Sequence, residues 1–406
     1  MAGYAEGMPE FSFDALRRFP DHEAPNLFAV DATDRLLLDE AAVALAGRVP
    51  TPGEIVVVGD AYGALTLGAI ALLGATDVRV HQDAAVGERA LAANAERLGV
   101  DGGFRNLPLG EELFTGASLV LLQLPKHLEA LHEIAAAVAR WGAVDVRLLA
   151  GGRVKHLTPA MNEVLGRSFA TVTASLARQK SRVLRASDPV TAAVEGARDE
   201  ADTTASTALR TEHHADIGLT IAAAGAAFAG TKLDIGTRFL LEALPEIGPD
   251  ARTAIDLGCG TGVLAVSLAI ARPELAVIAT DQSAAAVAST TATIAANDDA
   301  DRRLAERITV LRDDGLSMQP DASADLIVLN PPFHSGTTVH TGVAHDLFAE
   351  AARVLQPGGT LAVVWNSHLG YRAALERLVG PTTQFARNQK FTVTVSRPRA
   401  VGEPRP

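Results

Sequence analysis

Cysteine is almost absent from this chain of 406 residues, and aromatic residues make up only 4% of it. The single cysteine, Cys259, excludes a disulfide within the chain and a cysteine-rich metal site, and we predict no metal centre. One unpaired thiol is typical of a protein in a reducing compartment, so we expect a cytoplasmic location.

Basic residues are outnumbered by acidic ones, and the formal net charge is −12. This balance argues against a protein that coats nucleic acid without specificity, because neutralising phosphates requires Lys and Arg. A local basic surface is still compatible with it, because a partner responds to the local field.

Targeting and membrane signals are also missing. Segment 1–13 has neither a basic region nor an apolar run, so we expect no signal peptide. The longest apolar stretch, 55–75, contains Asp60 and four glycines, which argues against a membrane helix. It predicts a strand, a tight turn and a helix instead.

That strand–turn–helix pattern occurs twice, at 55–74 and at 253–271. A second strand, a helix ending in Ala-Ala-Asn and a third apolar strand follow each copy at similar spacing. We therefore predict an internal duplication of an α/β domain, each copy a Rossmann-like parallel sheet covered by helices on both faces. Periodicity is lost between the copies, so we expect domains at 1–187 and 211–406 with a linker at 188–210.

The two copies differ in the residues that carry chemistry. The second has an Asp-x-Gly-x-Gly-x-Gly pattern, whereas the first has a valine for the acid and Ala61 for the middle glycine. The strand that ends in Asp281 in the second copy ends in Gln82 in the first. One copy is therefore predicted to keep a complete site and the other to have lost it.

The glycine-rich loop of the second copy predicts a ligand site at the carboxyl edge of the sheet. Glycines let the backbone approach a ligand closely, and open α/β sheets bind ligands at this edge. An acid at the end of the next strand suits ribose hydroxyls, and one after the third strand suits an adenine amino group. The acid inside the loop would hold an ammonium group and repel a pyrophosphate, which favours S-adenosylmethionine over NAD. The predicted cofactor-binding residues are Asp256, Gly258, Gly260, Gly262, Asp281, Asp313, Asp314 and Asn330.

The stretch "LIVLNPPFH" (326–334) predicts the catalytic residues Asn330, Pro331 and Phe333. The Asn330 side chain and the Pro331 carbonyl can each accept a hydrogen bond from one exocyclic NH₂ group. Such positioning aims the nitrogen lone pair at an electrophilic methyl group without a strong base. Phe333 can stack on a planar base. The alternative is a Pro-Pro loop that only terminates a strand.

Further substrate-binding candidates are His334, Asn366 and the basic stretch 167–185, represented by Arg178, Lys180 and Arg182. A solvated surface is the alternative for the basic stretch. Lys232 and Asp234 either close over the cofactor or cap the helix that follows. Trp365 is interpreted as a core residue.

These residues together resemble the ribosomal RNA guanine-N2 methyltransferases, which consist of two tandem methyltransferase folds with a degenerate first copy. The resemblance covers nearly the whole chain, and the first half is similar to the large-subunit branch. It is carried by segments 16–20, 29–38, 59–65, 124–131, 150–157, 231–245, 256–269, 329–334 and 388–398. It implies methyl transfer from S-adenosylmethionine to N2 of a guanine in 23S ribosomal RNA, with the first domain recognising RNA. Trp365 departs from the small residue that the resemblance leads us to expect there.

Other readings remain open at this point. The same loop chemistry also methylates guanine in 16S ribosomal RNA, adenine N6 or a glutamine amide. A different class is a non-catalytic RNA-binding assembly factor with a vestigial cofactor site. Two tandem copies of a fold in one chain often take the place of two subunits of a dimer, so we favour a monomer.

Overall fold

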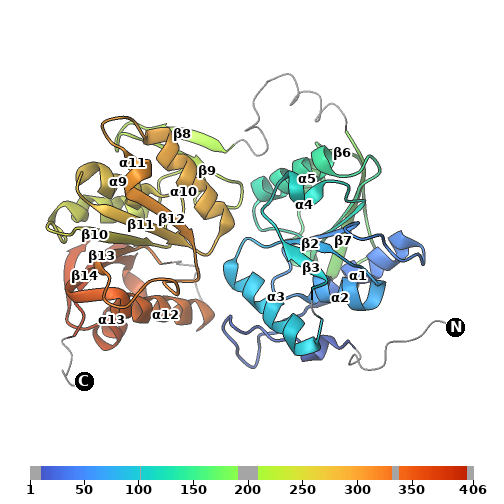
Figure 1. The fold of residues 1–406 in the computed structure, drawn as a ribbon, viewed down its shortest axis with the longest axis horizontal. Coiled ribbons are helices and arrows are strands. Elements are labelled where there is room, and N and C mark those ends of the chain that lie inside the picture. The colour runs from blue at the N-terminus through green and yellow to red at the C-terminus, as the bar shows by residue number, and fades with distance from the viewer. Residues whose placement is uncertain (1–10, 101, 191–208, 332–337, 400–406) are drawn as a thin grey trace. The chain divides into compact units, whose positions relative to one another are not determined.

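The computed structural model describes residues 11–100, 102–190, 209–331 and 338–399, with the backbone alone for 338–341. The chain divides into two units, Met1–Ala208 and Leu209–Pro406, and each is described by itself. Each unit contains a seven-stranded sheet flanked by helices (Figure 1).

The sheet of the first unit has the strand order β3-β2-β1-β4-β5-β7-β6. Strands β1 to β5 are parallel, whereas β7 is antiparallel to both β5 and β6. The strands are β1 (Ile55–Val58), β2 (Val78–His81), β3 (Phe104–Asn106), β4 (Leu119–Gln123), β5 (Arg147–Arg153), β6 (Phe169–Ala174) and β7 (Ser181–Pro189). The helices are α1 (Ala32–Leu45), α2 (Ala64–Leu73), α3 (Ala85–Leu98), α4 (Glu111–Phe114), α5 (Leu128–Trp141) and α6 (Pro159–Leu165), with 3₁₀ turns at Phe13–Ala15 and Val154–His156.

The second unit repeats this topology strand for strand, in the order β12-β11-β10-β13-β14-β16-β15. Its strands are β10 (Thr253–Leu257), β11 (Ala276–Asp281), β12 (Ile308–Arg312), β13 (Ala324–Leu329), β14 (Leu355–Asn366), β15 (Thr382–Arg387) and β16 (Phe391–Ser396), preceded by the hairpin β8 (Arg210–His214) and β9 (Leu219–Ala223). Its helices are α8 (Ile235–Ala243), α9 (Val263–Ala271), α10 (Ala284–Asn297), α11 (Leu304–Arg307), α12 (Thr338–Val354) and α13 (Arg372–Leu378), with 3₁₀ turns at Leu244–Glu246 and Ser367–Leu369. The predicted fold class, two tandem Rossmann-like methyltransferase folds, is confirmed.

The expected linker, 188–210, falls mostly outside the described residues. Strand β7 extends to Pro189 and strand β8 begins at Arg210. Among the described residues, no helix is both long and apolar enough to cross a membrane.

Alternation along each strand sends neighbouring side chains to opposite faces of the sheet. In β13, Leu326 and Val328 pack into the cluster formed with α8 and α9, whereas Ile327 and Leu329 pack into the cluster formed with α12. The next residue on the first of these faces is Asn330. The strand period therefore directs Asn330 toward α8.

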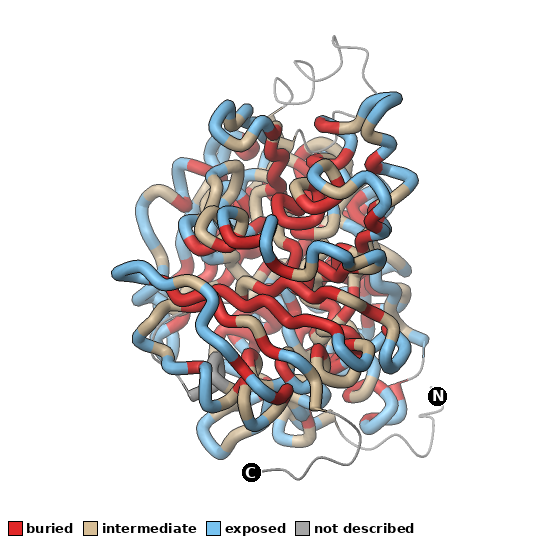
Figure 2. Tube along the Cα trace, turned by 90° about the vertical axis from the view of Figure 1, so that its left-hand side faces the viewer, coloured by how far each residue is buried: buried red, intermediate tan, exposed pale blue. Residues whose placement is uncertain are grey.

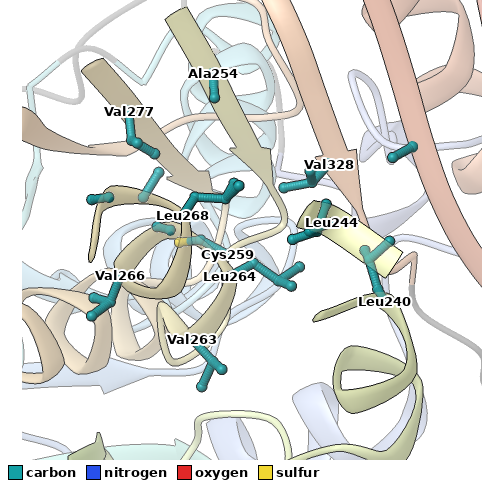
Figure 3. Packing of buried hydrophobic residues seen from close by; sticks show 14 of the residues in the cluster. Leu240, Leu244, Ala254, Cys259, Val263, Leu264, Val266, Leu268, Val277 and Val328 are labelled. Atoms are coloured by element: carbon teal, nitrogen blue, oxygen red, sulfur yellow. The ribbon is translucent and has the colours of Figure 1, made fainter. Parts of the chain in front are cut away.

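The central strands are therefore buried on both faces, whereas β6, β8 and β15 are largely exposed. The inner faces of the helices are buried too (Figure 2). Figure 3 shows the cluster on the α8 and α9 side, where Leu240, Leu264 and Leu268 meet side chains of the central strands. Cys259 lies in this cluster at 7% exposure, and burial raises the pKa of its thiol.

Candidate active site

The site lies where β10 and β13 end side by side. These strands are parallel neighbours, and their register pairs Leu257 with Leu329. The loop after β10 and Asn330 after β13 therefore leave the sheet at the same level. The chain turns outward through β11 and β12 before it returns to β13, so this edge is the switch point at which open α/β sheets bind ligands.

The loop between β10 and α9 is built on three glycines with positive φ. The φ values of Gly258, Gly260 and Gly262 are 73°, 55° and 78°, a region that residues with a Cβ atom rarely adopt. A Cβ atom on Gly262 would lie 2.8 Å from Thr290 Cγ2, whereas one on Gly258 or Gly260 would meet no atom within 4 Å. Gly262 is thus required for close packing, and the other two leave open space beside the backbone.

Asp281, at the end of β11, is held beside this loop. Its Oδ2 accepts a hydrogen bond from the Gly260 N–H at 3.0 Å, and its Oδ1 accepts one from the Ser283 N–H at 2.9 Å. The acid that follows the second strand is therefore at the glycine loop, as a ribose-binding carboxylate requires.

Asp256 lies beneath the loop and is 1% exposed. Its Oδ2 accepts a hydrogen bond from the Ala265 N–H at 2.9 Å, but its buried Oδ1 has no hydrogen-bond partner. Burial raises the pKa of Asp256 to about 7, the charge of Asp281 adds to this, and the bond from Ala265 opposes it. A buried acceptor without a partner costs about 1–3 kcal/mol, so a cationic donor at this position would be bound favourably.

The two acids after β12 differ in their surroundings. Asp313 is fully buried, with hydrogen bonds from Ser317 Oγ at 2.5 Å and from the Met318 N–H at 2.8 Å. These bonds hold the turn that follows β12. Asp314 is half-buried.

Asn330 is fixed by two acceptors from the start of α8. Its Nδ2 donates to Asp234 Oδ2 at 2.9 Å and to Thr237 Oγ1 at 2.9 Å. A carboxylate oxygen accepts and does not donate, so the amide nitrogen must face Asp234. The Asn330 Oδ1 atom is buried and has no hydrogen-bond partner. The geometry therefore presents an unsatisfied acceptor at the strand end.

The remaining predicted residues near the strand ends are placed as follows. Pro331 is buried directly after Asn330. Asn366 is half-buried at the end of β14, one strand further along the sheet. Phe333 and His334 lie outside the described residues. Trp365 is 5% exposed and donates from Nε1 to Thr394 Oγ1 at 3.2 Å, so its interpretation as a core residue is confirmed.

The start of α8 contributes Asp234, which the sequence analysis named, and two residues that it did not name. Asp234 caps the helix, because its Oδ2 also accepts from the Thr237 N–H at 3.0 Å. Capping was one of its two expected roles, but its contact with Asn330 was not foreseen. Thr237 and the buried Gly236 were missed altogether. Their signal is the helix-start pattern "LDIGT" (233–237), which places Thr237 one helical turn after Asp234.

The basic stretch 167–185 forms the hairpin β6–β7 of the first unit. Arg178 and Ser181 exchange backbone hydrogen bonds of 2.9 and 2.8 Å around a two-residue turn, which places Lys180 at the exposed tip. Arg178 forms an ion pair with Asp39 of α1 at 2.7 Å. Arg182 is half-buried. Part of this positive charge is therefore neutralised within the unit.

The corresponding edge of the first unit is filled by its own side chains. Gln82, which replaces the acid after the second strand, is 3% exposed and donates to the Gly87 carbonyl at 3.2 Å. Gln123, at the position of Asn330, donates to Asp34 Oδ1 of α1 at 2.5 Å. Burial raises the pKa of Asp34 to about 7. The first unit thus keeps the amide-to-helix contact but not the cofactor loop.

The donor set of the second unit fits S-adenosylmethionine. The orphaned Asp256 Oδ1 suits the ammonium group, and the open space at Gly258 and Gly260 leaves room for a ligand close to the backbone. Asp281 lies at the glycine loop through its bond from the Gly260 N–H, and Asp314 is half-buried after β12.

Each of the two units matches a known protein family. The family "RLMG N-terminal domain" matches residues 8–190, and the family "Methyltransferase small domain" matches residues 218–395. The chain is 34% identical to the ribosomal RNA large subunit methyltransferase G of Streptomyces coelicolor, over 93% of this chain and 96% of that protein. It is 35% identical to the protein of the same name from Pseudomonas aeruginosa, over 93% and 96%.

A solved structure shares the whole tandem fold. It is a T. thermophilus 16S rRNA N2 methyltransferase in complex with AdoMet and guanosine, 24% identical, with a TM-score of 0.70 over 91% of this chain and 92% of that chain. At this identity the similarity shows the fold alone. The matches to the curated relatives extend over both units, and the chain belongs to the ribosomal RNA large subunit methyltransferase G family.

Proposed function

We propose that the protein transfers the methyl group of S-adenosylmethionine to the exocyclic N2 of a guanine in 23S ribosomal RNA. Its relatives are large-subunit ribosomal RNA methyltransferases by name, and its second unit carries the residues that the chemistry needs. The cytoplasm, where ribosomes are assembled, is the matching location.

The observation that carries this proposal is the orientation of the Asn330 amide. Its Oδ1 is buried and unsatisfied while its Nδ2 is held by α8. An acceptor of this kind is complementary to an NH₂ group, and Pro331 supplies a second carbonyl one residue further along. A carboxylate substrate would leave both acceptors without a donor, and an alcohol could donate to only one of them.

The residues then act by binding and orienting. Bound S-adenosylmethionine supplies a methyl group on a sulfonium, which is electrophilic enough to react with an amine. Asn330 Oδ1 and the Pro331 carbonyl would accept hydrogen bonds from the two N2–H groups, so that the nitrogen lone pair faces the methyl group. As the N–C bond forms and the S–C bond breaks, these acceptors stabilise the positive charge that develops on nitrogen. One N2 proton is then lost to solvent.

The first unit is proposed to contribute RNA contacts rather than catalysis. Its cofactor edge is filled by Gln82 and Gln123, and its exposed β6–β7 tip carries Lys180. A target guanine inside paired RNA would have to leave its stack, at a cost of a few kcal/mol.

The test is methyl transfer to ribosomal RNA from a strain that lacks this protein. The purified protein is incubated with methyl-labelled S-adenosylmethionine, and 16S and 23S RNA are digested separately to nucleosides. Label in N2-methylguanosine from 23S RNA alone is the expected result. Label in 16S RNA, in N6-methyladenosine or in protein glutamine would show that the substrate is not a 23S guanine. No label at all would favour a non-catalytic assembly factor.

A further inference from the structure

The start of α8 and the end of β13 meet at a single carboxylate oxygen. Asp234 Oδ2 accepts the Thr237 N–H at 3.0 Å and the Asn330 Nδ2 at 2.9 Å. The first bond caps α8, and the second fixes a side chain 96 residues further along the chain. One atom therefore couples the geometry of a helix start to the orientation of the proposed catalytic amide.

Both hydrogens of the Asn330 amide are used in this arrangement. Thr237 Oγ1 accepts the second bond at 2.9 Å. Because the Asp234 carboxylate only accepts, a rotated amide would place its oxygen against this group and would lose the bond, although the Thr237 hydroxyl could then donate. The observed orientation is thus selected, and Oδ1 is left as the acceptor that faces away from α8's polar groups.

Gly236 is what allows this close approach. It is buried, and a Cβ atom at this position would lie 3.0 Å from Asp234 Oδ2 and 3.4 Å from Asn330 Oδ1. The backbone of α8 therefore lies against both polar groups, with the Phe391 ring beside them, because its Cε1 would be 3.2 Å from the same Cβ atom.

We propose that Asp234 and Thr237 are positioning residues for methyl transfer: they hold the Asn330 amide so that its oxygen, and not its nitrogen, meets the guanine N2 group. This inference rests on the proposed function. The role belongs to the acceptor atoms, not to the negative charge, because an oxygen at the Oδ2 position suffices for both bonds.

Three substitutions at position 234 separate this role from its alternatives. Asp234→Asn can place its oxygen at the Oδ2 position and keep both bonds. Asp234→Ser still caps the helix, because serine is as good an N-cap as aspartate, but its shorter side chain does not reach Asn330. Asp234→Ala removes both functions.

Thr237 offers a matched pair with less influence on the helix cap. Thr237→Ser keeps the hydroxyl acceptor, whereas Thr237→Val has nearly the same shape without it. Combining Thr237→Val with Asp234→Ser leaves the Asn330 amide with neither acceptor.

The experiment measures the single-turnover rate constant on 23S RNA, the Kd for S-adenosylmethionine, the Kd for RNA and the Tm for each variant. We expect Asp234→Asn and Thr237→Ser to stay within about 3-fold of the wild-type rate, and Asp234→Ser and Thr237→Val to fall by about 10- to 100-fold, as small misplacements do. The double variant should fall to the rate of Asn330→Ala. Both Kd values should remain close to wild type, and the Tm of Asp234→Ser and of Thr237→Val should fall by only a few degrees, because each loses a single hydrogen bond of a half-buried amide.

Each other outcome overturns the proposal in a distinguishable way. An Asp234→Ser variant at the wild-type rate shows that the contact with Asn330 is dispensable. Equal losses in Asp234→Asn and Asp234→Ser show that charge is what matters. A rate that falls in step with the Tm or the cofactor affinity shows a structural cap only. A wild-type protein that labels no ribosomal RNA overturns the proposed function itself, and this proposal with it.

Discussion

Asn297 of α10 holds the backbone of Thr220 in β9 through both of its polar groups. Its Oδ1 accepts the Thr220 N–H at 2.9 Å, and its Nδ2 donates to the Thr220 carbonyl at 2.7 Å. In the first unit, Asn94 of α3 makes the same pair of bonds with Arg17, at 2.9 and 2.8 Å. The repeated Ala-Ala-Asn of the sequence is thus a clamp that fixes, in each unit, the segment preceding the first helix of the fold.

We predict that Asn297→Ala and Asn94→Ala each lower the free energy of unfolding by about 1–3 kcal/mol, because two partly buried backbone groups lose their partners. Urea unfolding followed by circular dichroism measures the change. The control is Asn162→Ala on the exposed face of α6, for which a change within about 0.5 kcal/mol is expected. Equal effects of all three substitutions would contradict the clamp.

Asn330→Ala is expected to reduce methyl transfer by at least about 100-fold, because an oriented acceptor of developing charge is lost. The Kd for S-adenosylmethionine should stay within about 3-fold of wild type, since the cofactor groups at Asp256 and Asp281 are untouched. Single-turnover labelling and calorimetric titration measure the two quantities. A variant that retains transfer within a few-fold would exclude Asn330 from orienting the amine.

Much of this architecture could be predicted from the chain alone. The glycine loop, the strand that ends in Asp281 and the Asn-Pro-Pro segment are short local patterns, and the duplication aligns them. The link between Asp234 and Asn330 could not be predicted, because it joins residues far apart in sequence, and only the strand period and the packing of α8 bring them together. The difference between Asp313 and Asp314 was also hidden, since adjacent acids look alike until their burial is known.

The affinity for S-adenosylmethionine should depend on pH through Asp256. Burial raises the pKa of Asp256 to about 7 in the free protein, so below that pH the carboxyl carries a proton that binding an ammonium group must release. The affinity is therefore expected to rise with pH, by up to about tenfold per unit between pH 5 and 7. It should fall again above pH of about 8, where an α-amino group loses its proton.

Calorimetric titrations between pH 5.5 and 8.5, in buffers of different ionisation enthalpy, measure both the affinity and the released proton. Asp256→Asn cannot release this proton, so it should bind more weakly and without the rise between pH 5.5 and 7. A wild-type affinity that is constant over this range would show that Asp256 does not face the ammonium group.

Gly262→Ala is expected to damage the cofactor loop. The φ of Gly262 is 78°, and a Cβ atom would also lie 3.1 Å from the Thr290 Cα atom, which is backbone and does not yield. We predict a loss of about 2–4 kcal/mol of unfolding free energy, from strain and overpacking together, with weaker binding of S-adenosylmethionine. Gly248→Ala is the control, because its φ is 54° but its nearest contact would be 3.6 Å away. It should cost only about 1–2 kcal/mol. Equal costs would mean that the contact with Thr290 relaxes freely.

Lys180→Ala tests whether the β6–β7 tip contacts RNA. Lys180 is exposed, with a φ of 64° in a two-residue turn, and an alanine there leaves the hairpin backbone unchanged. If the side chain neutralises one phosphate, the affinity for 23S RNA should fall, and the slope of log K against log salt should decrease by about 0.7–0.9. The control is Arg185→Ala, because Arg185 is held by two hydrogen bonds to Glu40 of α1, at 2.7 and 2.9 Å. Filter binding at several salt concentrations should leave the slope of Arg185→Ala unchanged, and an unchanged slope for Lys180→Ala would move the RNA surface away from this hairpin.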